Sequence, residues 1–117
     1  MLVLLDNGRR RVEKVKDKKD IEPHSRGQVW KIDENARTAT LVTNADLGVY
    51  APAMGSSHRL KNGNYHFTTG AVRQDGTGTA KSIEVTPDGK IVYVLDTPGN
   101  TTYRSNRVAD LYTPPNR

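Results

Sequence analysis

The chain of 117 residues contains no cysteine, which excludes disulfide crosslinks, thiolate metal centres and cysteine nucleophiles. Hydrophobic residues make up only 34% of the sequence and aromatic residues 6%, so we expect a thin core, or one that another chain completes. No apolar run approaches the ~20 residues that a membrane-spanning helix needs. These shortages predict one small domain that is not embedded in a membrane.

A cleavable leader is also missing from the sequence pattern. The apolar opening Met1–Leu5 is too short for a signal-peptide core and is followed at once by Asp6. We therefore expect a cytoplasmic chain that stays where it is made, unless it is a piece of a longer, exported protein.

Positive charge is in excess, at a net +5, and it is concentrated near the amino terminus. The run from Arg9 to Lys19 holds seven basic and two acidic residues. Such a run either contacts phosphates or forms a solvated loop, and the loop is the more common outcome. No aromatic residue interleaves the bases, so the stacking platform of a single-strand binder is absent and nucleic acid is disfavoured as a partner.

The sequence does contain the period-two alternation of half-buried β-strands. Trp30 and Ile32 alternate with polar neighbours, and Lys81–Val85 repeats the pattern. The polar stretch from Arg9 to Arg26 sustains neither the helical nor the strand period. We predict an all-β fold, with strands at residues 2–5, 28–33, 38–43, 57–61, 64–69, 81–85 and 90–96.

Two turn signals organise the second half of the chain. Asn62-Gly63 favours a type I′ turn, because both central residues of that turn need positive φ. Pro87-Asp88-Gly89 favours a type I turn with glycine in the left-handed position. We therefore predict that residues 55–96 form two consecutive hairpins and one four-stranded antiparallel sheet.

The last predicted strand, Lys90–Asp96, is apolar on both faces, and we expect a second sheet or a neighbouring chain to cover it. The predicted organisation has three parts. They are an incomplete sheet unit over 1–54 with a basic polar loop at 9–26, the four-stranded sheet at 55–96, and a docked tail at 97–117. Tyr103 and Val108 are among the residues expected to pin the tail.

Several segments together resemble the bacterial arylsulfate sulfotransferases, in order and over nearly the whole chain. The first is Asp6-Asn7-Gly8 with Arg11, which is similar to an Asp-Asn-Gly-x-x-Arg segment of that family. The others are Ser25-Arg26-Gly27 leading into Val29–Asp33, Gly55–Asn64, Ile83–Val92, and Tyr103-Arg104-Ser105 through Leu111-Tyr112.

The resemblance implies the carboxy-terminal part of a six-bladed β-propeller, usually periplasmic, which moves a sulfuryl group between phenols through a sulfated histidine. This chain would supply about one and a half to two propeller-blade-like sheets. Exposed blade faces associate, so we expect a homo-oligomer, such as a ring closed by several copies. A phenolic or anionic small molecule is the expected ligand, and no cofactor is expected.

His58 and Arg11 are the candidate catalytic residues. His58 lies near the start of an expected inner strand, and Arg11 matches the family segment, although it stands within an Arg-Arg-Arg run. A neutral imidazole can attack sulfur, while a guanidinium can hold the oxygens of the ester. The alternative is a role-free sheet histidine and a solvated arginine. His24 and His66 complete no metal-binding spacing with His58.

Three functions remain open at this point: a sulfotransferase-like enzyme that is active only when completed, a non-catalytic oligomeric binding module, and a nucleic-acid binder that uses residues 9–19. The Gly76–Lys81 segment lacks the Gly-Lys-Ser/Thr ending of a phosphate loop and leads into a strand, so we discount nucleotide binding.

Overall fold

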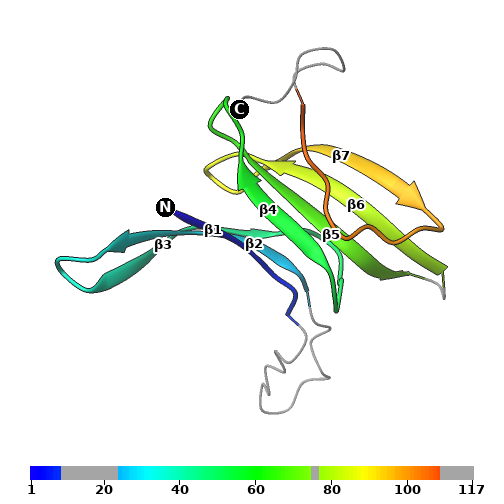
Figure 1. Cartoon of the computed structure of the whole chain (residues 1–117), viewed down its shortest axis with the longest axis horizontal. Helices are drawn as coiled ribbons and strands as arrows, with labels where there is room; N and C mark the ends of the chain where they lie inside the picture. Colours follow the sequence, from blue (N-terminus) through cyan, green and yellow to red (C-terminus); the bar gives the residue numbers. More distant parts are fainter. Residues whose placement is uncertain (9–23, 75–76, 109–117) are drawn as a thin grey trace.

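The computed structural model describes residues 1–8, 24–74 and 77–108, and this part of the chain is entirely β-structure without a helix. The first sheet has the order β1-β2-β3 and the second the order β4-β5-β6-β7, with antiparallel neighbours throughout (Figure 1). The all-β prediction is confirmed. The strands are β1 (Leu2–Asp6), β2 (Arg26–Asp33), β3 (Thr38–Asp46), β4 (Gly55–Arg59), β5 (Tyr65–Gln74), β6 (Thr77–Val85) and β7 (Ile91–Pro98).

The two sheets pack face to face, and the hydrophobic core lies between them. Val29 of β2 and Phe67 of β5 are both fully buried there. Gly27 allows this close approach, because a Cβ at that position would lie 2.4 Å from the Phe67 ring. The other core residues are Ala45, Leu47, Tyr65, Ile83 and Val85, with Val3, Leu5 and Val49 packed at the margin.

Strands β1 and β4 lie beside each other where the two sheets meet, although each is the edge strand of its own sheet. The Ser57 hydroxyl donates to the carbonyl of Val3 at 3.0 Å and ties the two strands together. At another point of contact the Thr43 hydroxyl donates to the carbonyl of Pro87 at 2.6 Å. The sheets are therefore joined by hydrogen bonds as well as by the apolar core.

The family-like segments near the amino terminus hold the connector between β3 and β4. Asn7 Nδ2 donates to the carbonyls of Ala51, at 2.7 Å, and Met54, at 3.2 Å. Ser25, which is fully buried, accepts the Ala51 amide at 2.9 Å and exchanges backbone hydrogen bonds with the same connector. Gly8 has a φ of 73°, which glycine adopts at little cost. These residues are structural anchors.

The β4–β5 and β6–β7 hairpins of the second sheet close with the same turn. Gly63 donates to the carbonyl of Leu60 at 3.0 Å and has a φ of 90°. Gly89 donates to the carbonyl of Thr86 at 2.9 Å and has a φ of 91°. The prediction for Gly89 is confirmed. The predicted type I′ turn is wrong, because Asn62 does not have a positive φ and only the glycine is left-handed.

Strand β7 is exposed on both faces, so the described residues do not provide the cover that we expected. Val92 is 49% exposed and Leu95 is 52% exposed. β7 is the outer edge of the second sheet, and the shorter first sheet has no fourth strand opposite it. Strands β5 and β6 are both longer than the predicted strands at 64–69 and 81–85, since β5 continues to Gln74 and β6 begins at Thr77.

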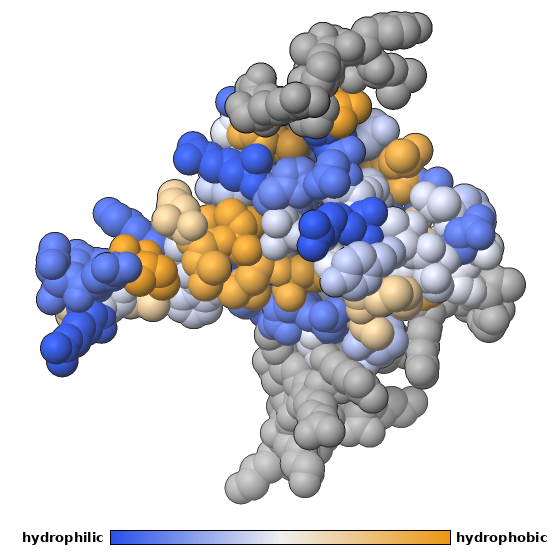
Figure 2. Space-filling model, in the orientation of Figure 1, coloured by the Kyte–Doolittle hydropathy of each residue, from blue (hydrophilic) through white to orange (hydrophobic). Residues whose placement is uncertain are grey.

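Apolar surface also gathers on the first sheet. Figure 2 shows it over the start of β1 and the adjoining part of the β2–β3 hairpin, whose distal end extends past the second sheet in Figure 1. Leu2 is 49% exposed and Ile32 is 46% exposed. None of the described residues forms a helix long and apolar enough to cross a membrane.

Candidate functional site

Two histidines face each other on the outer face of the second sheet. His58 of β4 and His66 of β5 are direct partners in the antiparallel register, so their side chains share a face. Tyr65 and Phe67 point into the core, so His66 between them lies on the opposite face of its strand. The rings stack with their centroids 4.7 Å apart and their planes 30° from parallel.

The histidine pair differs in exposure. His66 is 1% exposed, whereas His58 is only half-buried at the edge strand. Desolvation lowers the pKa of His58. Desolvation, followed by repulsion from His58 and Arg107, lowers the pKa of His66 to about 4. Both imidazoles are therefore neutral near pH 7, and one of them is accessible to a ligand.

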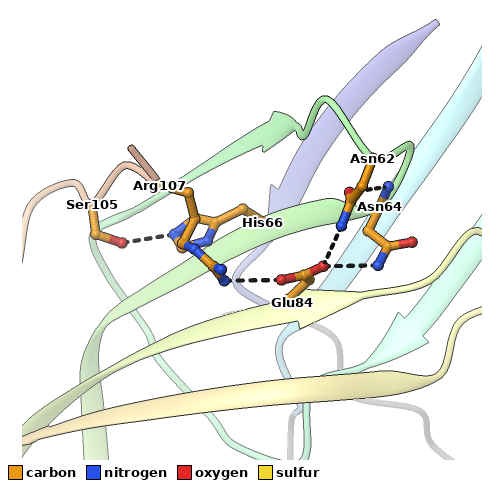
Figure 3. Close-up of polar contacts among 6 residues, drawn as sticks. All are labelled: Asn62, Asn64, His66, Glu84, Ser105 and Arg107. Atoms are coloured by element: carbon orange, nitrogen blue, oxygen red, sulfur yellow. Dashed lines mark hydrogen bonds and ion pairs between the residues drawn. The ribbon is translucent and has the colours of Figure 1, made fainter. Parts of the chain in front are cut away.

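Ser105, from the segment after β7, contacts His66 (Figure 3) and two further hydroxyl groups. Its Oγ is 2.9 Å from His66 Nε2, 2.5 Å from Thr68 Oγ1 and 2.8 Å from Ser82 Oγ. His66 Nδ1 is buried and has no hydrogen-bond partner. An orphaned buried N–H is rarer than an orphaned lone pair, so the ring proton is assigned to Nε2, which donates to Ser105.

Glu84 anchors a second polar cluster on the same face. One carboxylate oxygen accepts from Asn62, at 3.0 Å, and Asn64, at 2.8 Å, while the other accepts from Arg107 at 2.9 Å (Figure 3). The hydrogen bonds from Asn64 and Asn62, with help from Arg107, hold the pKa of Glu84 below its ordinary value. Arg107 also lies 4.9 Å from the centre of the Tyr93 ring. Arg107 therefore contacts both the Glu84 carboxylate and an aromatic ring.

The segment from Thr102 to Arg107, which we call the strap, covers this face. Figure 1 shows the chain turning back across the second sheet after β7. The Thr102 amide donates to the carbonyl of Gly70 at 2.9 Å. A Cβ on Gly70 would lie 2.1 Å from the Thr102 carbonyl oxygen, so the contact requires glycine. Tyr103 is 71% exposed, and polar residues rather than this aromatic hold the strap.

Of the two residues predicted to be catalytic, His58 is placed at the site and Arg11 lies outside the described residues. His24 is remote from the pair: its Nδ1 is 3.5 Å from Asp46, near the surface of the first sheet. Within the described parts of the chain, no group of three or more histidine, aspartate or glutamate residues could hold a metal ion.

Sequence reasoning missed the pairing of His58 with His66, and the cause is the turn. A type I′ turn at Asn62-Gly63 would place Lys61 opposite Asn64 and therefore His58 opposite Phe67. The observed turn shifts the register by one residue, and a shift of one exchanges the faces. The turn geometry was thus the missing signal.

The fold and the site together define an all-β protein of face-to-face antiparallel sheets that carries a partly buried histidine pair on one outer face. Comparison with protein-family models gives a match to the arylsulfotransferase (ASST) family over residues 1–104. The chain belongs to this family, and the resemblance noted in the sequence is confirmed. Neither the curated proteins nor the solved structures contain a match.

Proposed function

We propose that the chain carries part of the sulfuryl-transfer site of an arylsulfotransferase, and that His58 is the group that accepts the sulfuryl group. The observation that carries the proposal is the His58 imidazole: neutral, half-exposed on an edge strand, and stacked on the buried ring of His66. Membership of the arylsulfotransferase family supports the reaction class.

In the proposed reaction a ring nitrogen of His58 attacks the sulfur of a phenolic sulfate ester. The new bond joins nitrogen to sulfur, and the bond between sulfur and the phenolic oxygen breaks, so that phenolate leaves. A second phenol then attacks the same sulfur, loses its proton to solvent and regenerates the neutral imidazole. Neutrality matters at the first step, because a protonated ring has no lone pair on the attacking nitrogen.

His66 is suited to support this step without reacting. Its buried ring packs against His58, and its Nε2 is held by Ser105, so the stack restricts the orientation of the exposed imidazole. Arg11 is proposed to bind the ester oxygens, as the family resemblance implies. Further blades complete the site in this proposal, so the isolated chain is expected to accept a sulfuryl group slowly and to turn over poorly.

The test is single-turnover labelling of the full chain with excess p-nitrophenyl sulfate, followed by peptide mass analysis and by addition of phenol. The expected result is release of p-nitrophenolate with a sulfuryl group on the peptide that contains His58, and its discharge by phenol. His58→Ala should abolish the label, whereas His24→Ala, which alters a histidine remote from the pair, should leave it unchanged.

Two outcomes would contradict this reading. Labelling that persists in His58→Ala would assign the chemistry to another group. Absence of any label, together with saturable binding of p-nitrophenyl sulfate, would instead favour the non-catalytic binding module.

A further inference from the structure

The two stacked imidazoles differ in access rather than in chemistry. Both rings are neutral near pH 7, because burial lowers the pKa of each, and a neutral ring has a lone pair with which to attack an electrophile. His66 is nevertheless 1% exposed, whereas His58 is half-buried on the edge strand β4. What covers His66 therefore decides which of the two rings can react.

The cover over His66 includes the strap. His66 points away from the core, toward the face of the second sheet that the strap crosses (Figure 1). Ser105 of the strap lies against the ring, with its Oγ 2.9 Å from Nε2 (Figure 3). The charge of Arg107, also in the strap, is close enough to lower the pKa of His66. On this face the ring thus meets two strap side chains besides its neighbour His58.

With the strap in place, neither nitrogen of His66 is available to a ligand. Nε2 carries the ring proton and donates it to Ser105, so this nitrogen has no lone pair. Nδ1 has the lone pair, but it is buried and has no hydrogen-bond partner in the described chain. If the strap moved away, Nε2 would lose Ser105 and face solvent. Water could then exchange the proton between the two nitrogens, and Nε2 would gain a lone pair.

We infer that the strap restricts sulfuryl acceptance to His58, and that release of the strap makes His66 a second acceptor. The sulfuryl part of this inference rests on the proposed function, whereas the shielding of His66 does not. In the added step Nε2 of His66 attacks the sulfur of the phenolic sulfate ester. The nitrogen–sulfur bond forms, the bond from sulfur to the phenolic oxygen breaks, and phenolate leaves. A strap that closed over the product would keep the second phenol from reaching it, so the group would not be passed on.

The chain should still accept only one sulfuryl group at a time. A sulfuryl group on either imidazole adds a negative charge, and the ester donor is an anion too. The two ring centres are 4.7 Å apart, so a loaded ring repels a second donor at its neighbour. Release of the strap should therefore divide one sulfuryl group between His58 and His66 instead of adding a second.

The shielding of His66 can be measured without sulfuryl chemistry. Diethyl pyrocarbonate acylates neutral imidazoles, and tryptic peptides then report each ring separately. His24, His58 and His66 lie in the tryptic peptides 20–26, 38–59 and 62–73, respectively. His24, whose side chain is 43% exposed, serves as the internal standard. In the unmodified full chain we expect His66 to be acylated at least about tenfold more slowly than His58.

Gly70→Ala should expose His66, because the added Cβ would displace the strap at Thr102. We expect acylation of peptide 62–73 to accelerate by at least about tenfold. Gly78→Ala is the matched control on the adjacent strand. Its Cβ would make one contact, at an ordinary distance of 3.5 Å, so His66 should stay shielded.

A second way of releasing the strap guards against an effect of Gly70→Ala on folding. Ser105→Ala combined with Arg107→Gln removes two contacts of the strap and adds no atoms beside β5, and it should expose His66 in the same way. Circular dichroism checks that each variant keeps its β-structure. The shielding is refuted if His66 reacts as fast as His58 in the unmodified chain, or if it stays protected in both released forms.

The sulfuryl part is tested with p-nitrophenyl sulfate in the absence of His58. His58→Ala should take no label, and His58→Ala combined with Gly70→Ala should regain it on peptide 62–73. The inference is overturned if Gly70→Ala exposes His66 to acylation but the combined variant stays unlabelled. A label on His58 of the unmodified chain would then still uphold the proposed function. No label on any form would instead overturn the proposed function and the sulfuryl part of the inference with it, while the acylation rates decide the shielding separately.

Discussion

Replacement of Gly70 by alanine should release the strap. The added Cβ would lie 2.1 Å from the carbonyl oxygen of Thr102 and 2.8 Å from Cβ of Met54, and neither is the flexible end of a side chain. The strap must therefore move away from β5. The outer face of the second sheet, where His58 and His66 stack, would then lose the cover that Ser105 and Arg107 provide.

The magnitude follows from the contacts that the strap makes. The Thr102–Gly70 hydrogen bond is lost directly, and a neutral hydrogen bond contributes about 1 kcal/mol net. If the hydrogen bond between Ser105 and His66 and the half-exposed ion pair of Arg107 with Glu84 are also lost, at about 1 kcal/mol each, the total is about 3 kcal/mol. An opening equilibrium that shifts by this amount changes about 100-fold.

Limited trypsin digestion measures this opening, because Arg104 and Arg107 both lie in the strap. When opening is fast relative to cleavage, the cleavage rate follows the open population. We expect cleavage after Arg107 to accelerate by at least about tenfold in Gly70→Ala, and by up to about 100-fold if the whole strap is released.

Gly78→Ala is the control for the trypsin experiment. Gly78 lies on the adjacent strand β6, and a Cβ there would meet only the Thr101 methyl group at 3.5 Å, an ordinary contact. Its cleavage rate should stay close to that of the unmodified chain. Equal rates in Gly70→Ala and the unmodified chain would refute the account of the strap as a closely fitted segment.

Three further predictions concern stability. The pKa of His66 is about 4 in the folded chain against about 6.5 when unfolded, so the unfolded state binds more protons between these pH values. The free energy of unfolding, measured by chemical denaturation, should therefore fall by up to about 3 kcal/mol from pH 7 to pH 4. In His66→Gln this dependence on pH should be weaker. Phe67→Ala should cost about 3–5 kcal/mol by the same measurement, whereas Val94→Ala, on exposed β7, should change stability by less than about 0.5 kcal/mol. Glu84→Gln should raise the rate of trypsin cleavage after Arg107 at low salt, because the charged partner is removed. A rate that matches the unmodified chain would leave Ser105 and the Thr102–Gly70 hydrogen bond as the contacts that hold the strap.

The strands were predictable because their signals are local. Alternation placed Ile83 and Val85 on the buried face of β6, and the Pro87-Asp88-Gly89 segment fixed the turn that follows them. Register was less secure, because it depends on which residues occupy the centre of a turn. The misplaced turn at Asn62-Gly63 was enough to conceal the partner of His58.

The contacts of the strap were beyond sequence reasoning for a different reason. Apolar content pointed to Tyr103 and Val108 as anchors, yet they are 71% and 55% exposed. The strap is held by Ser105, through three short polar contacts with β5 and β6. Such contacts join residues 23 to 39 positions apart and have no periodic signature.

The strap gives the stack of sheets a direction. In proteins built from repeated layers, a terminal unit with a polar outer face acts as a cap and stops further addition. Here the second sheet is the capped end, because the chain itself occupies its outer face. The first sheet has no such cover, since its outer face exposes Leu2 and Ile32. The described chain thus presents apolar side chains on the outer side of β1–β3 and a strapped, polar face on the opposite side.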